Sequence, residues 1–314
     1  MHTLSVIVPV YNSAKILPQL VQRLGKVKAD NRWLLELILI NDGSKDDSWS
    51  VIGDLAEHYP WIHGINLMRN YGQHNALLCG IRQAKNEIII TMDDDLQHPP
   101  EEIPKLLSEL DKGFDVVYGT PQKEQHGFWR DTASQSTKLV LQSAMGADVA
   151  RSITSFRAFR SSLREAFASY SGSYVFLDAL LTWGTTRFSA LPVRHDPRES
   201  GMSNYNFRKL IVHALNMITG FSVLPLQISS LIGFAFTLIG FVLLTYVGFR
   251  ALTQSSELWG FYVLAAMITI FAGAQLFALG IIGEYLARMH FRMMERPTYT
   301  IRQRLQKSEK PNIS

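Results

Sequence analysis

Three adjacent aspartates, Asp93, Asp94 and Asp95, directly follow the mostly apolar run EIIITM at residues 87–92. Ionised carboxylates repel one another and are costly to desolvate, so the run is either a solvated turn or a set of ligands for a cation. In an extended chain alternate side chains share a face, so Asp93 and Asp95 would point to one site and Asp94 elsewhere. Such oxygen ligands suit Mg²⁺ or Mn²⁺, which usually also contacts substrate phosphates.

Polar residues also follow the earlier apolar runs. VPVYN contains Tyr11, and the run at 34–42 leads into NDGS, which contains Asp42. Asp42 could accept a hydrogen bond from a base or a ribose, and Tyr11 could stack on a base. The ordinary alternatives are a turn aspartate and a surface tyrosine, and for each residue taken alone these are the commoner cases.

The segments that must position these residues alternate between strand-like and helix-like patterns up to about residue 205. The predicted strands are 4–10, 34–42, 62–68, 87–93 and 114–119. The predicted helices are 17–27, 49–58, 75–85 and 100–110. This alternation, with nearly continuous apolar strands, indicates an α/β fold whose mostly parallel sheet is covered on both faces. Ligands of such folds bind at the carboxyl ends of the strands, where the polar residues lie.

Composition excludes several classes of protein. The chain has 314 residues, 47% of them hydrophobic, which excludes bulk disorder and allows one or two domains with a core. A single cysteine, Cys79, excludes an intrachain disulfide framework and a Cys-based zinc site. The N-terminal residues are not typical of a secretory signal. The sequence has no Walker A and no G-x-G-x-x-G motif, which argues against P-loop ATPases and nicotinamide dehydrogenases. We expect no nucleic-acid partner.

The chain changes character after residue 205. Residues 206–227 are amphipathic and are predicted to lie in a membrane interface, with an ordinary core helix as the alternative. The stretches 228–249 and 259–283 carry no charge and are long enough to cross a bilayer. A short polar link joins them, so we predict two antiparallel transmembrane helices within 228–287. The small residues that would allow these helices to pack closely are Gly273, Ala274, Ala278, Gly280 and Gly283.

Basic residues predict the orientation of these helices. The link between them contains one, Arg250, whereas many follow the second helix. The basic residues of the segment 288–314 are Arg288, Arg292, Arg296, Arg302, Arg304, Lys307 and Lys310. We therefore expect an inner-membrane protein whose two termini and first 205 residues are cytoplasmic. The segment 288–314 is predicted to be a tail that either binds anionic lipid headgroups or is solvated.

The motifs at their spacing resemble the family 2 glycosyltransferases that act on polyprenyl phosphates, a group that includes dolichol-phosphate mannose synthase and the bactoprenol glucosyltransferases. They are VPVYN (8–12), NDGSKDDS (41–48), RNYGQHNALLCG (69–80), MDDDLQHPPEEIP (92–104) and RESGMSNY (198–205). The likeness is greatest to the undecaprenyl-phosphate 4-deoxy-4-formamido-L-arabinose transferases. It implies a Rossmann-like GT-A domain at 1–205 and inverting transfer of a sugar from a UDP- or GDP-type donor to a polyprenyl phosphate. It also allows a homo-oligomer, such as a tetramer.

The resemblance also assigns roles to residues. It gives the metal and the donor diphosphate to Asp93, Asp95 and Gln97, with the metal being Mg²⁺ or Mn²⁺. The residues that it places at the donor are Pro9, Tyr11, Asp42, Asn70, Gln73 and Arg130. The residues that it places at the acceptor phosphate are Arg198, Ser203 and Tyr205, and Asp93, Asp95 and Arg198 form the implied catalytic set.

Three positions depart from the pattern of the family. Ser13 replaces a common glutamate, Asn204 replaces a common lysine, and Arg151 stands where an aspartate often lies six residues before Arg157. The departures leave two other interpretations open: a processive or protein-directed transferase of the same fold, and a non-catalytic, membrane-anchored scaffold or binding subunit. The intact aspartate motif argues against the scaffold, and the presence of only two predicted spans argues against the processive enzyme.

Overall fold

The computed structural model describes residues 2–121, 149, 152–172, 175–196, 224–253, 259–294 and 297–305. The chain divides into two compact units, one comprising Met1–Ile211 with Arg296–Ser314 and the other comprising Val212–Glu295. The first unit therefore includes residues from both ends of the sequence, which the predicted boundary at residue 205 did not anticipate.

The first unit is built on a sheet of eight strands among the described residues, in the order β7-β5-β6-β4-β1-β2-β3-β8. The strands are β1 (Thr3–Val10), β2 (Leu34–Asn41), β3 (Ile62–Leu67), β4 (Ile88–Thr91), β5 (Val116–Pro121), β6 (Arg157–Arg160), β7 (Phe188–Val193) and β8 (Ile301–Leu305). Strands β1 to β4 pair in parallel, as the sequence predicted. The sheet as a whole is mixed, because β6 runs antiparallel to both β4 and β5, and β8 runs antiparallel to β3.

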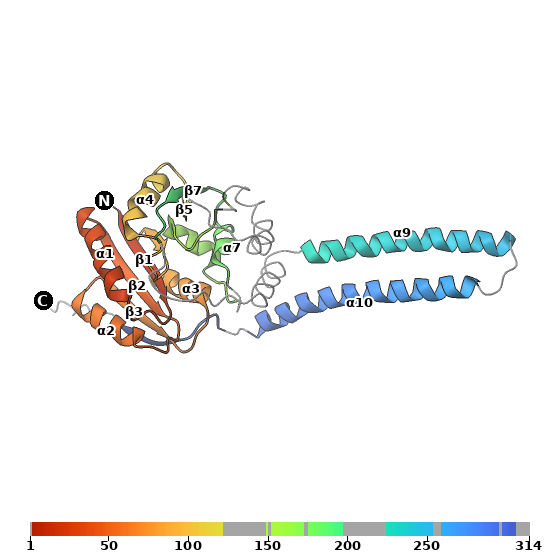
Figure 1. The fold of residues 1–314 in the computed structure, drawn as a ribbon, viewed down its shortest axis with the longest axis horizontal. Coiled ribbons are helices and arrows are strands. Elements are labelled where there is room, and N and C mark those ends of the chain that lie inside the picture. Colours follow the sequence, from red (N-terminus) through yellow and green to blue (C-terminus); the bar gives the residue numbers. More distant parts are fainter. Residues whose placement is uncertain are drawn as a thin grey trace. The chain divides into compact units, whose positions relative to one another are not determined.

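Helices cover both faces of this sheet (Figure 1). They are α1 (Leu17–Asp30), α2 (Ser48–His58), α3 (Gln73–Gln83), α4 (Ile103–Asp111) and α7 (Leu177–Leu181), with 3₁₀ turns at Pro100–Glu102 and Ser161–Phe167. The main core forms where Leu4, Val6 and Val8 of β1 pack with the apolar sides of α1 and α4. On the opposite face α3 lies so close that a Cβ on Gly80 would come within 2.5 Å of Ile7 Cγ2.

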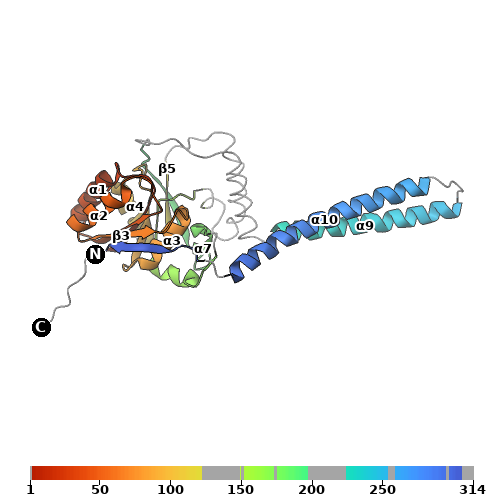
Figure 2. The same cartoon turned by 90° about the horizontal axis from the view of Figure 1, so that it is seen from below.

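The C-terminal segment is the main correction to the predicted domain boundaries. Residues Ile301–Leu305 are not a tail, because they form β8 and pair with β3 at the edge of the sheet. An edge strand exposes unpaired backbone N–H and C=O groups, and β8 supplies partners for those of β3. In Figure 2 this strand runs alongside β3. In IRQRL only the two end residues are apolar, so the segment lacks the alternation that marks a strand, and basic charge dominates it.

The second unit contains two long helices, α9 (Leu224–Thr253) and α10 (Trp259–Met293), which lie side by side in both views (Figures 1 and 2). Each contains an 18-residue window long and apolar enough to cross a membrane, Leu226–Leu243 with a mean hydropathy of 2.0 and Ile270–Ala287 with 1.6. Only 6% and 0% of these windows are buried, whereas a core helix of a soluble protein would be mostly buried. The two predicted spans are therefore present as helices.

The helices differ from the prediction in their limits and in their contact. α9 begins at Leu224, inside the segment predicted to be interfacial, and α10 continues to Met293, past the predicted start of the tail. The close contact between them is made by Gly240, whose added Cβ would lie 2.6 Å from Phe271 Cζ. No atom lies within 4 Å of an added Cβ at Gly273, Gly280 or Gly283, so the prediction that these glycines bring the helices together was wrong.

Candidate functional site

The loops that follow β1, β2, β3 and β4 lie at one edge of the sheet, because these neighbouring strands are parallel. Hydrogen bonds join the first two loops directly. The Asn12 N–H donates to Ser44 Oγ at 3.0 Å, and the Lys45 N–H donates to Asn12 Oδ1 at 2.8 Å. Polar residues 32 and 33 positions apart in the sequence are thereby held together at one surface.

Asp42 anchors the loop after β3. It is 3% exposed, and its two carboxylate oxygens accept hydrogen bonds from the N–H groups of Tyr71 at 2.7 Å and Gly72 at 2.8 Å. Burial raises the pKa of Asp42, and these two hydrogen bonds partly offset that effect. The neighbouring Gly43 has a φ of +66°, and an added Cβ would lie 2.5 Å from the Asn70 N atom. Only glycine allows the two loops to approach this closely.

Asp93 belongs to the segment Met92–Gln97, here termed the aspartate loop. Gln73 Nε2, at the first turn of α3, donates to Asp93 Oδ1 at 2.6 Å, and Ser155 Oγ donates to Asp93 Oδ2 at 2.6 Å. Burial raises the pKa of Asp93 to about 6; the hydrogen bond from Ser155 lowers it, and the charges of Asp95 and Asp94 raise it further. A cation bound at this carboxylate would relieve that unfavourable environment.

The other two aspartates have different neighbours. Asp94 Oδ2 accepts hydrogen bonds from Ser13 Oγ at 2.5 Å and from the Tyr11 N–H at 3.3 Å. Asp95 Oδ1 accepts a hydrogen bond from the Gln97 N–H at 3.2 Å, within the loop itself. The three carboxylates are therefore not equivalent. Ser13, one of the departures from the family pattern, is a hydrogen-bond partner of Asp94, so a carboxylate from the aspartate loop faces this residue.

A buried network of side chains connects to the aspartate loop through Ser155, and sequence reasoning missed it. Arg157 and Asp178 form an ion pair in which each is 2% exposed, and the Tyr118 hydroxyl donates to the same carboxylate at 2.8 Å. Arg157 Nε donates to Thr91 Oγ1 at 3.0 Å, and this hydroxyl donates to the Ser155 carbonyl at 2.7 Å. The network thus connects α7 to the serine that binds Asp93.

A second set of contacts joins the aspartate loop to the segment that precedes Arg198. The Asp196 N–H donates to the Gln97 carbonyl at 2.9 Å. The buried His98 ring stacks on Phe156 with centroids 5.3 Å apart and meets the His195 ring edge at 4.9 Å. The segment predicted to lead to the acceptor loop therefore begins beside the predicted metal ligands.

The remaining predicted residues fall into three groups. Tyr11, Asn70 and Gln73 are exposed at the strand ends, and Tyr11 is 46% exposed. Pro9 is buried within β1. The predicted residues that lie outside the described part of the chain are Arg130, Arg151, Arg198, Ser203, Asn204 and Tyr205.

The aspartate loop fits a hard divalent cation by the chemistry of its donors. Carboxylate and amide oxygens are the ligands that Mg²⁺ and Mn²⁺ prefer. Across the described residues no group of three or more His, Cys, Asp or Glu side chains forms a complete metal cage. A cation that binds one or two carboxylates together with substrate phosphates needs no such cage.

Comparison with known proteins decides the family. The sequence model described as Glycosyl transferase family 2 matches residues 5–171. The chain is 34% identical over 312 residues to the undecaprenyl-phosphate 4-deoxy-4-formamido-L-arabinose transferase of Enterobacter sp. (strain 638), covering 96% of this chain and 93% of the relative. The transferase of the same name from Klebsiella pneumoniae (strain ATCC 700721 / MGH 78578) is 34% identical over 308 residues, covering 97% and 94%. The chain belongs to glycosyl transferase family 2.

Solved structures agree with this assignment at the level of the fold. Glucosyl-3-phosphoglycerate synthase from Mycobacterium tuberculosis, crystallised with Mn²⁺, UDP-glucose and phosphoglyceric acid, aligns with a TM-score of 0.52. The alignment covers 69% of this glycosyltransferase and 78% of that chain at 15% identity. The first unit therefore has the GT-A fold that the sequence motifs predicted, and its mixed sheet is the sheet of that fold.

Proposed function

We propose that this family 2 glycosyltransferase moves a sugar from a nucleotide-diphosphate donor onto undecaprenyl phosphate, with inversion at the anomeric carbon. The product would be a lipid-linked monosaccharide for the modification of cell-envelope glycan or lipid. The observation that carries the proposal is the 34% identity along 96% of the chain to transferases that act on undecaprenyl phosphate. The arrangement of the aspartate loop at the strand ends supports the same chemistry.

The donor would bind over the carboxyl ends of β1 to β4. Tyr11, Asn70 and Gln73 are exposed there and could contact the donor directly. Asp42 is buried and would act by holding the loop at Tyr71 in place. Pro9 is buried in β1 and would shape the bottom of the donor-binding site. Arg130 would add positive charge near the diphosphate.

Asp93, Asp95 and Gln97 would hold a divalent cation, Mg²⁺ or Mn²⁺. When bound, the cation neutralises the negative charge that develops on the departing diphosphate. Gln73 and Ser155 keep the Asp93 carboxylate oriented by hydrogen bonds of 2.6 Å each. Because these partners come from α3 and from the segment before β6, the carboxylate is preorganised by two separate parts of the chain.

The acceptor would approach from the side of Gln97, where Asp196 and His195 begin the loop that leads to Arg198, Ser203 and Tyr205. Arg198 would offset the repulsion between the acceptor phosphate and the donor diphosphate. The nucleophile is a phosphate oxygen that is already anionic near neutral pH, so a strong general base is not required. Replacement of the common aspartate by Arg151 is compatible with that route.

The helices α9 and α10 would cross the cytoplasmic membrane and hold the transferase at the lipid headgroups. In water their exposed apolar side chains would be unfavourable, as for Phe241, which is 65% exposed, and Leu276, which is 69% exposed. Hydrocarbon solvates such side chains, and both helices satisfy their own backbone hydrogen bonds. The excess of basic residues after α10 supports an orientation in which both termini and the GT-A domain would lie in the cytoplasm.

The test is transfer from a panel of nucleotide sugars to a short polyprenyl phosphate with Mg²⁺ or Mn²⁺, read by the mass of the lipid product. We expect Asp95→Asn to abolish transfer while the melting temperature stays near that of the parent protein. Asp94→Asn is the matched control and should keep most activity, since an amide oxygen can still accept from Ser13. Retention of most activity by Asp95→Asn would refute the metal assignment.

Arg198→Ala tests the acceptor side of the proposal. Loss of this guanidinium should weaken use of the lipid phosphate more than binding of the donor, and an equal loss in both would contradict its role. If the parent protein turned over no donor in the panel but bound a partner protein tightly, the scaffold interpretation would replace the enzyme.

A further inference from the structure

The residues that follow α10 in the chain meet the loop after β3. Residues 297–302, here termed the return segment, belong to the first unit and end in the first residues of β8. Because β8 is antiparallel to β3, it begins where β3 ends, with Ile301 opposite Leu67. The return segment therefore borders residues 68–72, here termed the donor loop, which include Asn70 and whose last two N–H groups are held by Asp42.

Two hydrogen bonds fasten the start of the donor loop to the return segment. The Met68 N–H donates to the Thr300 carbonyl at 2.9 Å, and Arg302 Nη2 donates to the Met68 carbonyl at 3.3 Å. The register of β3 against β8 shifts between Asn66 and Leu67, which leaves Arg302 as the extra residue of a β-bulge. A bulge redirects the side chain of its extra residue, and the Arg302 side chain meets the Met68 backbone.

Tyr299 fastens the return segment to α3. The Arg82 guanidinium lies over the half-buried Tyr299 ring, 5.8 Å from its centroid, and the Tyr299 hydroxyl contacts the side chains of Arg82 and Cys79. Cys79 is fully buried on α3, and the neighbouring Thr298 is only 5% exposed. The return segment is thus packed against the body of the domain in addition to pairing at its edge.

The return segment contacts both of the elements that flank the donor loop. This loop joins β3 to α3, and the return segment holds β3 through β8 and α3 through Tyr299. Arg82 extends the connection, because its Nη2 donates to the carbonyls of Ala168 at 3.1 Å and Tyr170 at 2.5 Å. Fixing both flanking elements reduces the number of conformations that the loop between them can adopt.

We propose that the return segment is part of the donor site, with Tyr299 and Arg302 as positioning residues for the donor loop. This proposal rests on the proposed function, because it assigns these residues to the binding of the nucleotide donor. The contacts of Tyr299 on α3 are Cys79 and Arg82, six and nine residues after Gln73. At 1.5 Å per residue these lie about 9 and 14 Å along the helix from Gln73, so Tyr299 acts through α3.

The expected effect follows from the fraction of time that the donor loop is correctly placed. If the loop adopts the binding arrangement only a tenth of the time, the apparent affinity for the donor falls about tenfold, while the reaction of bound donor is unchanged. Loss of a positioning residue should therefore raise KM for the donor and leave kcat and KM for the acceptor nearly unchanged.

The experiment uses the full chain in detergent and combines hydrogen–deuterium exchange without substrate with transfer kinetics, using the nucleotide sugar that gives product in the panel. We expect Tyr299→Ala to speed exchange at residues 68–72 and to raise KM for the donor about tenfold, with kcat and KM for the acceptor within about threefold of the parent. Tyr299→Phe keeps the ring under Arg82 and should restore KM for the donor to within about threefold of the parent.

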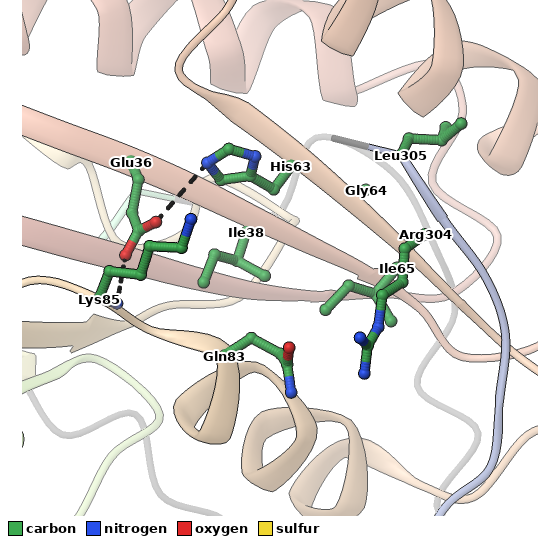
Figure 3. Close-up of a pocket in the computed structure, with 9 residues that line it drawn as sticks. All are labelled: Glu36, Ile38, His63, Gly64, Ile65, Gln83, Lys85, Arg304 and Leu305. Carbon is green, nitrogen blue, oxygen red and sulfur yellow. Dashed lines mark hydrogen bonds and ion pairs between the residues drawn. The ribbon is translucent and has the colours of Figure 1, made fainter. Parts of the chain in front are cut away.

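The matched controls lie at the other end of β8. Figure 3 shows that end, where Arg304 and Leu305 line a pocket together with Glu36 of β2 and His63 of β3. Leu305 is about 13 Å along the strand from Ile301. Leu305→Ala should lower the melting temperature and leave both exchange at 68–72 and KM for the donor unchanged.

A second pair of variants removes the same charge from two places on β8. Arg302→Ala should raise KM for the donor about threefold, because it removes the hydrogen bond to the Met68 carbonyl. Arg304, opposite Ile65, lies two residues further along the strand, and Arg304→Ala should leave KM for the donor within about 1.5-fold of the parent.

Three results would overturn the proposal. They are unchanged exchange at 68–72 in folded Tyr299→Ala and Arg302→Ala, an equal rise in KM for donor and acceptor, and a rise in KM for the donor in Leu305→Ala as large as in Tyr299→Ala. Absence of transfer by the parent protein would count against the proposed function alone, because the exchange measurement needs no substrate and still decides whether Tyr299 and Arg302 hold the donor loop.

Discussion

Asp178→Asn would remove the charge that balances Arg157 beneath the aspartate loop. Both side chains are 2% exposed, so the guanidinium in the variant would remain buried without its paired carboxylate, and only the charge of Asp93 would still favour it. Removing one partner of a buried ion pair costs about 3–5 kcal/mol, because the remaining charge has lost its solvation and its partner. The hydrogen bond from Arg157 Nε to Thr91 Oγ1 at 3.0 Å remains and offsets little of this cost. At about 2–4 °C per kcal/mol, the melting temperature should fall by about 6–20 °C.

The assay is thermal unfolding of the full chain in detergent, followed by intrinsic fluorescence. Tyr118→Phe is the matched control, since it removes a hydrogen bond of 2.8 Å to the same carboxylate and leaves the ion pair intact. It should cost about 1 kcal/mol. The double variant Arg157→Met with Asp178→Leu should recover most of the loss, because apolar side chains can replace a buried pair at little net cost. A melting temperature for Asp178→Asn as high as that of Tyr118→Phe would refute the reasoning.

Two further predictions concern packing and pH. Gly80→Ala should lower the free energy of unfolding by about 1–3 kcal/mol, because its Cβ would lie 2.5 Å from Ile7 Cγ2 and 2.8 Å from Ile40 Cδ1. Gly53→Ala, whose Cβ would meet only Leu305 at 3.8 Å, should be neutral or stabilising in the same denaturation experiment. The pKa of Asp93, raised from 3.8 to about 6, predicts that the metal-free protein binds more protons than its unfolded chain between those values. This group therefore contributes up to about 3 kcal/mol of stability below pH 4 that is lost as the pH rises to about 6. Mn²⁺ should consequently raise the melting temperature more at pH 7.5 than at pH 5, and an equal rise at both would contradict the site.

The parallel strands and the position of the aspartate loop could be predicted from the sequence, because both depend on local pattern. Strands buried on two faces read as apolar runs, and β1, β2 and β3 were predicted to within a residue at each end. The two long helices were predicted for a similar reason, since an apolar stretch of that length has few alternatives. The predicted ends of the helices were less accurate, because α10 continues past the end of the uncharged stretch at Gly283 to Met293.

The strands β6 and β8 and the network under Asp93 depended on contacts between distant parts of the chain. Short segments such as Arg157–Arg160 carry too little pattern to be recognised, and they become strands only because a neighbouring edge supplies hydrogen bonds. The same holds for Ser155 and Asp178, whose partners lie 62 and 21 residues away in the chain. A sequence shows which side chains carry charge, but burial and pairing decide what each charge does.

The sequence by itself therefore determined the family and the order of the first nine elements, and it predicted the candidate cation ligands, since these follow from residue type and spacing. Only the tertiary structure decided that Asp93 is held by Gln73 and Ser155, whereas Asp94 is held by Ser13. It also brought residues of β2, β3 and β8 together around one pocket, where Glu36 lies 3.6 Å from His63. The physical reason is that a hydrogen bond or an ion pair depends on the distance and direction between two groups, and folding sets both.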